Sequence, residues 1–264
     1  MAVQPDQLQR ERELMTIEIR DLEFRYSRRT SIFSNFSLAV DLFPAVLLGQ
    51  NGAGKSTLLS LVAGTSRPQS GYISVGGRRS QGRGALRQLR RKTGWLPQDV
   101  EALLGFTTEE QVTYAGWLKG MSRGDAASSA RRALEKVGLA DMREKQSRSL
   151  SGGQRRRLGI AQAIVHDPKL VLLDEPYAGL DPEQRASVRG TLLELANTTD
   201  LMVSTHQTED LEEVYKQVIV LREAKVLFSS SIATFYESAP KDSHAAVKAE
   251  LAYTNVLKLA GMKD

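Results

Sequence analysis

Short apolar runs alternate along this chain with longer segments that have an apolar face at helical spacing. The predicted strands lie at residues 16–26, 34–43, 45–49, 169–176 and 201–206, followed by a hairpin at 217–230. The predicted helices lie at residues 55–64, in parts of 107–148, and at 153–167 and 182–197. Because several strands are fully apolar, the pattern predicts a mostly parallel α/β sheet with helices on both faces.

The same pattern divides the chain into regions. Residues 1–15 are polar and charged, which predicts a loose N-terminal tail. Residues 16–238 form the predicted globular domain, and the helical stretch at about 99–165 indicates an inserted subdomain. Residues 239–264 predict a helical C-terminal tail. No run approaches the roughly 18 apolar residues needed to span a bilayer, so we expect any action at a membrane to require a partner.

A glycine-containing loop, GQNGAGKST, fits the pattern G-x-x-x-x-G-K-[ST] between a predicted strand and a predicted helix. Its glycines allow backbone N–H groups to curl around phosphates, and the following helix presents unpaired N–H groups and a positive dipole end. Lys55 would reach the β- and γ-phosphates of a nucleoside triphosphate, and Ser56 would ligate Mg²⁺. The predicted nucleotide-binding residues of this loop are Gly49, Gln50, Asn51, Gly52, Ala53, Gly54, Lys55, Ser56 and Thr57.

Two acids and a histidine follow later strands. Asp174 ends the apolar run LVLLD, where a carboxylate can hold Mg²⁺ directly or through a water. Glu175 comes next and points differently, so it can orient and polarise an attacking water. His206 ends the run LMVSTH, at the edge of a parallel sheet where ligands collect. We expect His206 to hydrogen-bond the γ-phosphate, with Glu175 and His206 as the catalytic residues.

A second loop of this kind, SLSGGQRRR at residues 149–157, opens another predicted helix. Ser151 is suited to cap that helix, and Gly152 and Gly153 leave the backbone open to close approach by an anion. The three arginines after Gln154 read most simply as a solvated helix face, and the alternative is that they add positive potential near phosphate.

Composition narrows the classes of function. The chain has no cysteine, which excludes a disulfide framework and a thiolate metal site. The formal net charge is +5, and residues 67–92 contain eight Lys or Arg and no acid. This segment is either a solvated basic face or a surface for anionic lipid or an acidic partner. No aromatic pattern beside it indicates nucleic-acid binding.

The order of these motifs resembles that of the ATP-binding subunit of an ABC transporter, of an exporter-like kind. LSGGQ, LVLLDEP, GLDP and a strand ending in His carry the resemblance, which runs from about residue 16 to 235. It implies a P-loop NTPase with a mostly parallel RecA-like core sheet, an N-terminal antiparallel β subdomain and an inserted α-helical subdomain. It also implies that Tyr26 stacks on adenine, that Gln98 contacts Mg²⁺, and that Asp181 communicates across a dimer. The implied cofactors are ATP and Mg²⁺, the metal being held by Ser56, Gln98 and Asp174.

The resemblance explains why one domain carries two phosphate loops. In this family two subunits pack head to tail, with ATP between the first loop of one and the LSGGQ of the other. Ser151, Gly152, Gly153 and Gln154 would then hold the γ-phosphate of the partner's ATP. The implied partners are a second ATPase subunit, as a homodimer, and integral membrane permease subunits. They would place this chain in the cytoplasm, on the inner face of the cell membrane.

Three functions compete on this basis. An ATPase that powers a separately encoded permease fits all the motifs. A non-transport relative acting on nucleic acid or ribosomes is disfavoured, because the chain has one cassette and no long coiled coil between Lys55 and Asp174. A scaffold that binds ATP without turnover is disfavoured by Glu175 and His206. Residues 105–121, followed by residues 134–142, resemble exporters of drugs, peptides or lipids, so export is the expected direction and import the alternative.

Two positions depart from the pattern of the family. Pro44-Ala45 stands where the family often has Pro-Gly, and Glu223-Ala224-Lys225 stands where the late hairpin often has a glycine. Because glycine is favoured there for its positive φ, we expect a longer or different turn. Neither change touches a reacting group, so an active ATPase is predicted.

Overall fold

The structure is a computed structural model, and it describes residues 15–27, 30–211, 214–240 and 243–261. The tail expected at residues 1–15 lies outside the described residues, except for Met15, which is buried. In the described ranges, no helix has both the length and the apolar character needed to cross a membrane.

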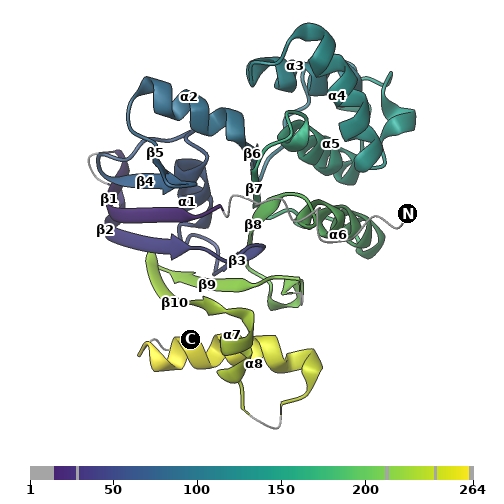
Figure 1. Cartoon of the computed structure of the whole chain (residues 1–264). Helices are drawn as coiled ribbons and strands as arrows, with labels where there is room; N and C mark the ends of the chain where they lie inside the picture. The colour runs from purple at the N-terminus through teal and green to yellow at the C-terminus, as the bar shows by residue number, and fades with distance from the viewer. Residues whose placement is uncertain (1–14, 28–29, 212–213, 241–242, 262–264) are drawn as a thin grey trace, which may run out of the picture.

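Two β-sheets form the body of the protein (Figure 1). The first is antiparallel, in the order β2 (Thr30–Val40), β1 (Ile17–Ser27), β4 (Ser70–Val75) and β5 (Arg78–Arg79). The second has the order β10 (Lys225–Ser231), β9 (Gln217–Arg222), β3 (Ala45–Leu48), β8 (Asp200–Thr205), β7 (Leu170–Asp174) and β6 (Thr93–Leu96). Its strands are parallel apart from β10. The expected fold class, with a mostly parallel sheet and an antiparallel N-terminal one, is confirmed.

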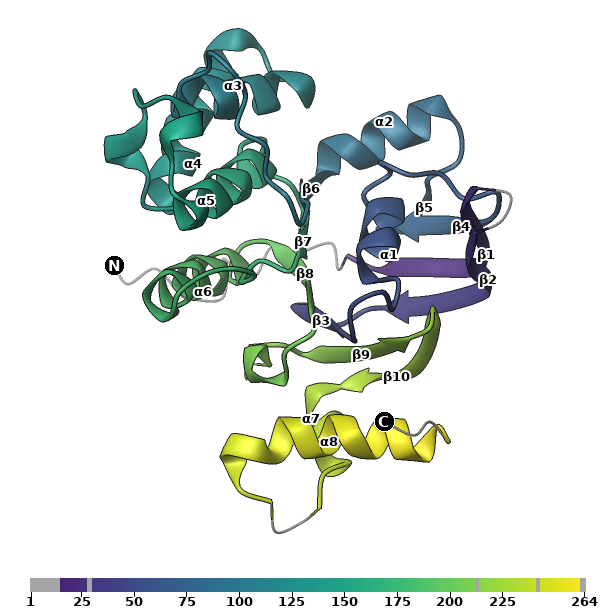
Figure 2. The ribbon, with the colours of Figure 1, turned by 180° about the vertical axis from the view of Figure 1, so that it is seen from behind.

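The helices fall into groups that both ribbon views agree on (Figures 1 and 2). Helices α3, α4 and α5 gather apart from the sheets and lie in the chain between β6 and β7, where the insertion is expected. Helices α7 and α8 lie beside β10 at the opposite end. The bounds are α1 (Lys55–Val62), α2 (Arg83–Lys92), α3 (Thr108–Leu118), α4 (Arg123–Lys136), α5 (Gly152–Ile164), α6 (Pro182–Ala196), α7 (Ile232–Glu237) and α8 (Ala245–Leu259).

The parallel sheet is buried on both faces, as its apolar strands predict. Successive side chains of a strand point to opposite faces, so they enter different cores. Leu47 packs with α1 and the antiparallel sheet, whereas its neighbour Val46 packs with α5 and α6. The same alternation separates Leu172 from Leu173. Burying each such side chain stabilises the fold by about 1.5–3 kcal/mol, so this sheet is the rigid frame of the molecule.

The sequence pattern predicts no elements between residues 65 and 96, where the structure has β4, β5, α2 and β6. Helix α2 buries only Leu86 and Leu89 among its ten residues, so its apolar stripe is too narrow for the periodicity to reveal. Strand β6 has four residues, too few to distinguish a strand from a short apolar stretch of helix.

The basic segment at residues 67–92 proves partly structural. Arg90 donates from Nε and Nη2 to the carbonyl oxygen of Gly64, at 2.8 and 2.6 Å. The guanidinium of Arg79 lies 4.0 Å from the ring centroid of Tyr72. Arg83 and Arg87 are exposed on α2, and for these two the solvated face and the anionic partner both remain predictions.

Lys119, directly after α3, joins the helical group to the core. Its ammonium Nζ donates to the carbonyl oxygens of Arg90 at 2.7 Å and Thr93 at 2.8 Å. Burial, and then repulsion from the Arg90 guanidinium, lower the pKa of Lys119 to about 8. Because the Lys119 ammonium is buried, it needs these carbonyl dipoles to offset its lost hydration. It therefore fixes the position of α3 relative to β6.

Of the two forms expected for the turn between β9 and β10, longer or different, the structure excludes the longer one. It has two residues, Glu223 and Ala224, whose φ angles are 48° and 58°. Both therefore occupy the left-handed region that a two-residue hairpin of this hand requires and that glycine usually fills. The Ala224 N–H donates to the carbonyl oxygen of Ala53 at 3.0 Å, so the turn also supports the first phosphate loop. That contact explains why the tight turn persists without glycine.

Replacing Ala224 with glycine should stabilise the protein. A left-handed alanine costs roughly 1–2 kcal/mol, and glycine removes most of that cost while keeping the N–H. Allowing for the greater freedom of glycine in the unfolded chain, Ala224→Gly should raise the free energy of unfolding by roughly 1 kcal/mol. Urea unfolding followed by circular dichroism would measure the change.

The control is Ala186→Gly, at an exposed site inside α6. There the same substitution should lower the free energy of unfolding by roughly 1 kcal/mol, because glycine is a poor helix former. Equal effects of the two substitutions would contradict the strained-turn interpretation.

Candidate functional site

The carboxyl ends of three neighbouring strands assemble the candidate site. Strand β8 pairs with β3 on one side and β7 on the other, in parallel register. The first phosphate loop leaves β3, Glu175 follows β7, and His206 follows β8. Parallel pairing therefore brings together residues that are far apart in sequence, as predicted for this edge of the sheet.

The phosphate loop curls around the ammonium of Lys55. Lys55 is 5% exposed, and its Nζ donates to the carbonyl oxygens of Gly49 at 2.6 Å and Gln50 at 3.2 Å. Gly52 and Gly54 have φ angles of 82° and 100°, which only glycine adopts without strain. The loop thus has the backbone form that lets successive N–H groups face an anion.

Glu175 meets both Lys55 and His206. Its Oε1 lies 3.2 Å from the Lys55 Nζ, and its Oε2 lies 2.9 Å from Nδ1 of His206. Glu175 and Lys55 are buried, whereas His206 is more than a third exposed. The structure therefore unites the cation of the phosphate loop with the two residues predicted to be catalytic.

Glu175 also has an unusual backbone. Its φ is 49°, a left-handed conformation that costs a non-glycine residue roughly 1–2 kcal/mol. Strain of this kind persists only where surrounding contacts determine it, and it concentrates at functional sites. The Glu175 N–H donates to Oγ of Ser204 at 3.0 Å, and the same Oγ donates to the Asp174 carboxylate at 2.5 Å. Ser204, in the middle of LMVSTH, thereby fixes both acids, a role that sequence analysis missed.

The segment after His206 is held by polar contacts of its own. Thr205 Oγ1 donates to Oδ2 of Asp210 at 2.6 Å, and Arg185 Nη2 donates to Oε1 of Gln207 at 2.6 Å. Burial raises the pKa of the Asp210 carboxyl, and the Thr205 bond and the Arg185 cation oppose that rise. The contacts link His206 to α6, which Asp181 caps.

The second loop forms the helix cap that its sequence predicts. Ser151 accepts the N–H of Gln154 at 3.3 Å, and Gln154 Oε1 accepts the N–H of Ser151 at 3.0 Å. A Cβ on Gly152 would meet nothing, whereas one on Gly153 would collide with the side chain of Gln184. The loop is thus a rigid helix N-terminus, with Gly152 facing outward from the monomer.

The interpretation of the three arginines as a solvated face is wrong for Arg156. Arg156 is 5% exposed and donates to carbonyl oxygens at the carboxyl ends of β6 and β7. The signal was present in the helical spacing, because Gly153, Arg156, Ile160 and Ile164 share the buried face of α5. Arg155 is exposed, as expected.

The remaining predicted residues lie near the site without contacting Glu175. Tyr26 is 64% exposed, and its hydroxyl lies 3.1 Å from Oγ1 of Thr57 in α1. Gln98 is exposed in the loop after β6. Asp181 caps α6 by accepting the N–H of Gln184 at 2.8 Å. Their roles in stacking, metal binding and dimer communication stay predictions.

Comparison with known proteins decides the family. The family model described as ABC transporter matches residues 39–178, which contain both phosphate loops and Glu175. The chain belongs to the ABC transporter family. Its place there is consistent with LSGGQ at the start of α5, since the first phosphate loop alone occurs in many nucleotide-binding proteins.

Two curated ABC proteins and one solved ABC cassette illustrate the similarity. The uncharacterised ATP-binding protein YxlF of Bacillus subtilis is 37% identical over 70% of this chain, which spans 61% of that protein. The cobalt import ATP-binding protein CbiO of Rhodobacter capsulatus is 36% identical, covering 80% of this chain and 77% of its own length. The ATP-binding cassette MJ0796, solved as a dimer with ADP and Pi, has a TM-score of 0.72 at 22% identity. That alignment covers 82% of this chain and 98% of the cassette, and it shows the same fold.

Proposed function

We propose that this protein binds and hydrolyses ATP as the cassette subunit of a membrane transporter. The contact of Glu175 with both Lys55 and His206 is the observation that carries the proposal. A carboxylate within reach of the phosphate-loop lysine lies where the γ-phosphate and its attacking water would meet. The family to which the chain belongs and its curated relatives support the same activity.

The site residues divide the work of hydrolysis. Phosphate oxygens would replace the loop carbonyls and Glu175 as partners of Lys55, because they carry more negative charge. Glu175 would then accept a proton from the attacking water, while His206 donates a hydrogen bond to the γ-phosphate. Tyr26 stands exposed beside α1, where its ring would stack on the adenine.

Ser56 and Asp174 suit a magnesium ion. A hydroxyl and a carboxylate are hard oxygen donors, and Mg²⁺ is usually held by one or two carboxylates together with phosphates and waters. The Ser204 hydroxyl already orients the Asp174 carboxylate by donating a hydrogen bond to its Oδ1. Bound there with ATP, the ion would neutralise charge that develops on the phosphates, and Gln98 would complete its protein ligands.

A head-to-tail dimer would complete the site. The N-terminus of α5, capped by Ser151, faces outward, and no atom lies against Gly152. An anion could therefore approach the backbone there. The γ-phosphate of a partner's ATP is that anion in our proposal. The dimeric state of the MJ0796 cassette supports this arrangement.

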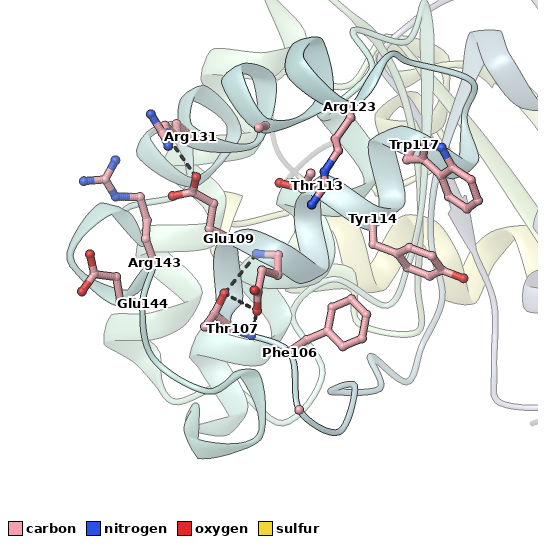
Figure 3. A pocket seen from close by; sticks show the side chains of 13 residues that line it. Phe106, Thr107, Glu109, Thr113, Tyr114, Trp117, Arg123, Arg131, Arg143 and Glu144 are labelled. Atoms are coloured by element: carbon pink, nitrogen blue, oxygen red, sulfur yellow. Dashed lines mark hydrogen bonds and ion pairs between the residues drawn. The ribbon is translucent and has the colours of Figure 1, made fainter.

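The permease would dock on the helical group. Figure 3 shows Phe106, Tyr114 and Trp117 along one side of a pocket beside α3. The Tyr114 and Trp117 rings stack 5.9 Å apart, and Trp117 is 56% exposed. Exposed aromatic clusters of this kind mark sites of protein contact. Lys119, directly after α3, ties this helix to the start of β6, so movement of the core would reach the docked helices.

Export of a drug, peptide or lipid-like substrate is our proposed direction, and it rests on residues 105–121 and 134–142. The cobalt importer relative makes import the second candidate. Localisation follows from the partner, since docking to a permease would hold the chain at the inner face of the membrane.

Glu175→Gln tests the chemistry. Removing the base should lower turnover by about 10²–10⁴-fold while leaving ATP affinity unchanged, so the ATP-bound dimer should accumulate. Phosphate release and size-exclusion chromatography measure the two effects. Glu194→Gln, an exposed change on α6, is the matched control and should behave as wild type. Wild-type turnover in Glu175→Gln would refute the assignment.

Gly152→Asp tests the dimer. An acid at the first residue of α5 suits the helix dipole, so the monomer should fold and bind ATP normally. Facing the γ-phosphate, it should lower ATP-dependent dimerisation and turnover by more than about tenfold, since 1.4 kcal/mol of repulsion already suffices.

Gly124→Asp makes the same change in the first turn of α4, where a Cβ also meets nothing. This control should dimerise and turn over ATP normally. Loss of ATP binding by the Gly152→Asp monomer would place the second loop in its own nucleotide site instead.

Tyr114→Ser with Trp117→Ser tests the docking face. Co-expressed with a membrane permease that co-purifies with the wild-type protein, the double variant should fail to co-purify, yet its isolated ATPase activity should match wild type. Leu259→Ser removes a comparably exposed apolar side chain from α8 and should leave the complex intact. Co-purification of the double variant would exclude this face.

A further inference from the structure

The guanidinium of Arg156 spans the ends of two core strands. Arg156 is the fifth residue of α5, and each of its five N–H donors meets a backbone carbonyl. Nη1 donates to Pro97 and Gln98, both at 2.7 Å, after β6. On the other side, Nη2 donates to the carbonyl oxygens of Asp174, the last residue of β7, and of Glu175 at 2.7 Å, and Nε donates to that of Pro176 at 3.2 Å.

Neighbouring arginines show that this placement is particular to residue 156. Arg155 is exposed. Arg157 donates to the carbonyls of Val137 and Gly138, so its bonds stay within the helical group. Among the three arginines of SLSGGQRRR, Arg156 alone reaches from the helical group to the catalytic edge of the core sheet.

Burying the charged guanidinium of Arg156 costs free energy unless hydrogen bonds replace its lost hydration. Desolvation lowers the pKa of Arg156 to about 10, while the nearby carboxylates of Asp174, Glu175 and Asp99 favour the cation. The group therefore stays charged at neutral pH. Its hydrogen bonds are all to carbonyl dipoles, so the planar fork needs every one of them to offset the lost hydration. A lysine has three donors and no fork, and it cannot reproduce the set.

The carbonyls that Arg156 binds surround the strained turn. Glu175 has a φ of 49°, and Arg156 Nη2 donates to both Asp174 and Glu175, while Nε donates to Pro176. Three successive carbonyls are thus held by one rigid group. The direction of the Glu175 side chain follows from this turn, because φ determines where the Cα–Cβ bond points.

We propose that Arg156 is a positioning residue for ATP hydrolysis, which locks the turn at Glu175 and the loop at Gln98 to the helix that begins with LSGGQ. The inference rests on the proposed ATPase function. When the N-terminus of α5 engages the partner's ATP, Arg156 transmits the position of that helix to Glu175 of its own subunit. One side chain thereby connects the two nucleotide sites of the dimer.

Arg156→Lys and Arg156→Gln test the proposal. Both should retain ATP affinity within about twofold, because neither touches the phosphate loop. Turnover should fall by roughly 10²-fold in each, since a displacement of about 1 Å at a catalytic group costs this much. The split between unchanged affinity and lowered kcat is the readout, measured by nucleotide titration and phosphate release. Arg156→Lys keeps the charge and guards against misfolding of the glutamine variant.

Two matched controls separate positioning from general stability. Arg155→Gln removes an exposed charge from the same helix, and Arg157→Gln removes bonds that stay inside the helical group. Both should keep at least half of the wild-type kcat. A loss in Arg157→Gln equal to that in Arg156→Gln would show that the helical group is merely destabilised, and would overturn the proposal.

A double-mutant cycle shows whether Arg156 acts through Glu175. In a Glu175→Gln background, adding Arg156→Lys should lower residual turnover by less than about twofold, because the group being positioned is already gone. ATP-induced dimerisation of this double variant should match that of Glu175→Gln alone. If the two substitutions lowered turnover multiplicatively, or if the double variant failed to dimerise, the proposal would be overturned. If wild-type protein itself failed to hydrolyse ATP, the proposed function would fail instead.

Discussion

Parallel pairing of β3, β8 and β7 is the constraint on which the candidate chemistry depends. Each strand is short and buried along nearly its whole length, so its register cannot slip without moving apolar side chains out of both cores. The register fixes where each strand ends, and the chain then contributes Lys55, Glu175 or His206 at the same edge. The catalytic geometry is thus set by hydrophobic packing well away from the polar groups.

Sequence alone predicted the parts of this site that depend on local pattern. The loop around Lys55, the acids after β7 and the cap at Ser151 follow from motifs whose backbone geometry is determined within a few residues. Contacts that depend on tertiary packing were missed. The sequence pattern predicts only a strand at Ser204 and only a charged run at Arg156, because the partners of both residues are distant in the sequence.

The helices and strands divide in the same way into those that the sequence pattern predicts and those that it misses. Strands with continuous apolar runs were predicted, whereas α2 and β6 were missed because one is mostly charged and the other is very short. The β9–β10 turn is not the longer loop that was one of its two predicted forms, and the cause is a different one. Glycine statistics describe the cost of a left-handed residue, but they say nothing of a bond elsewhere that offsets it, here from Ala224 to Ala53.

That bond also bears on how the protein is made. Ala53 is in the first quarter of the chain, and Ala224 follows most of the domain. Strand β9 likewise pairs with β3, which carries the phosphate loop. During synthesis the loop would therefore leave the ribosome long before the segment that supports it. A nascent chain would bind nucleotide in its native manner only after β9 and the turn at Ala224 have also emerged, since non-local contacts form after their intervening loop has closed.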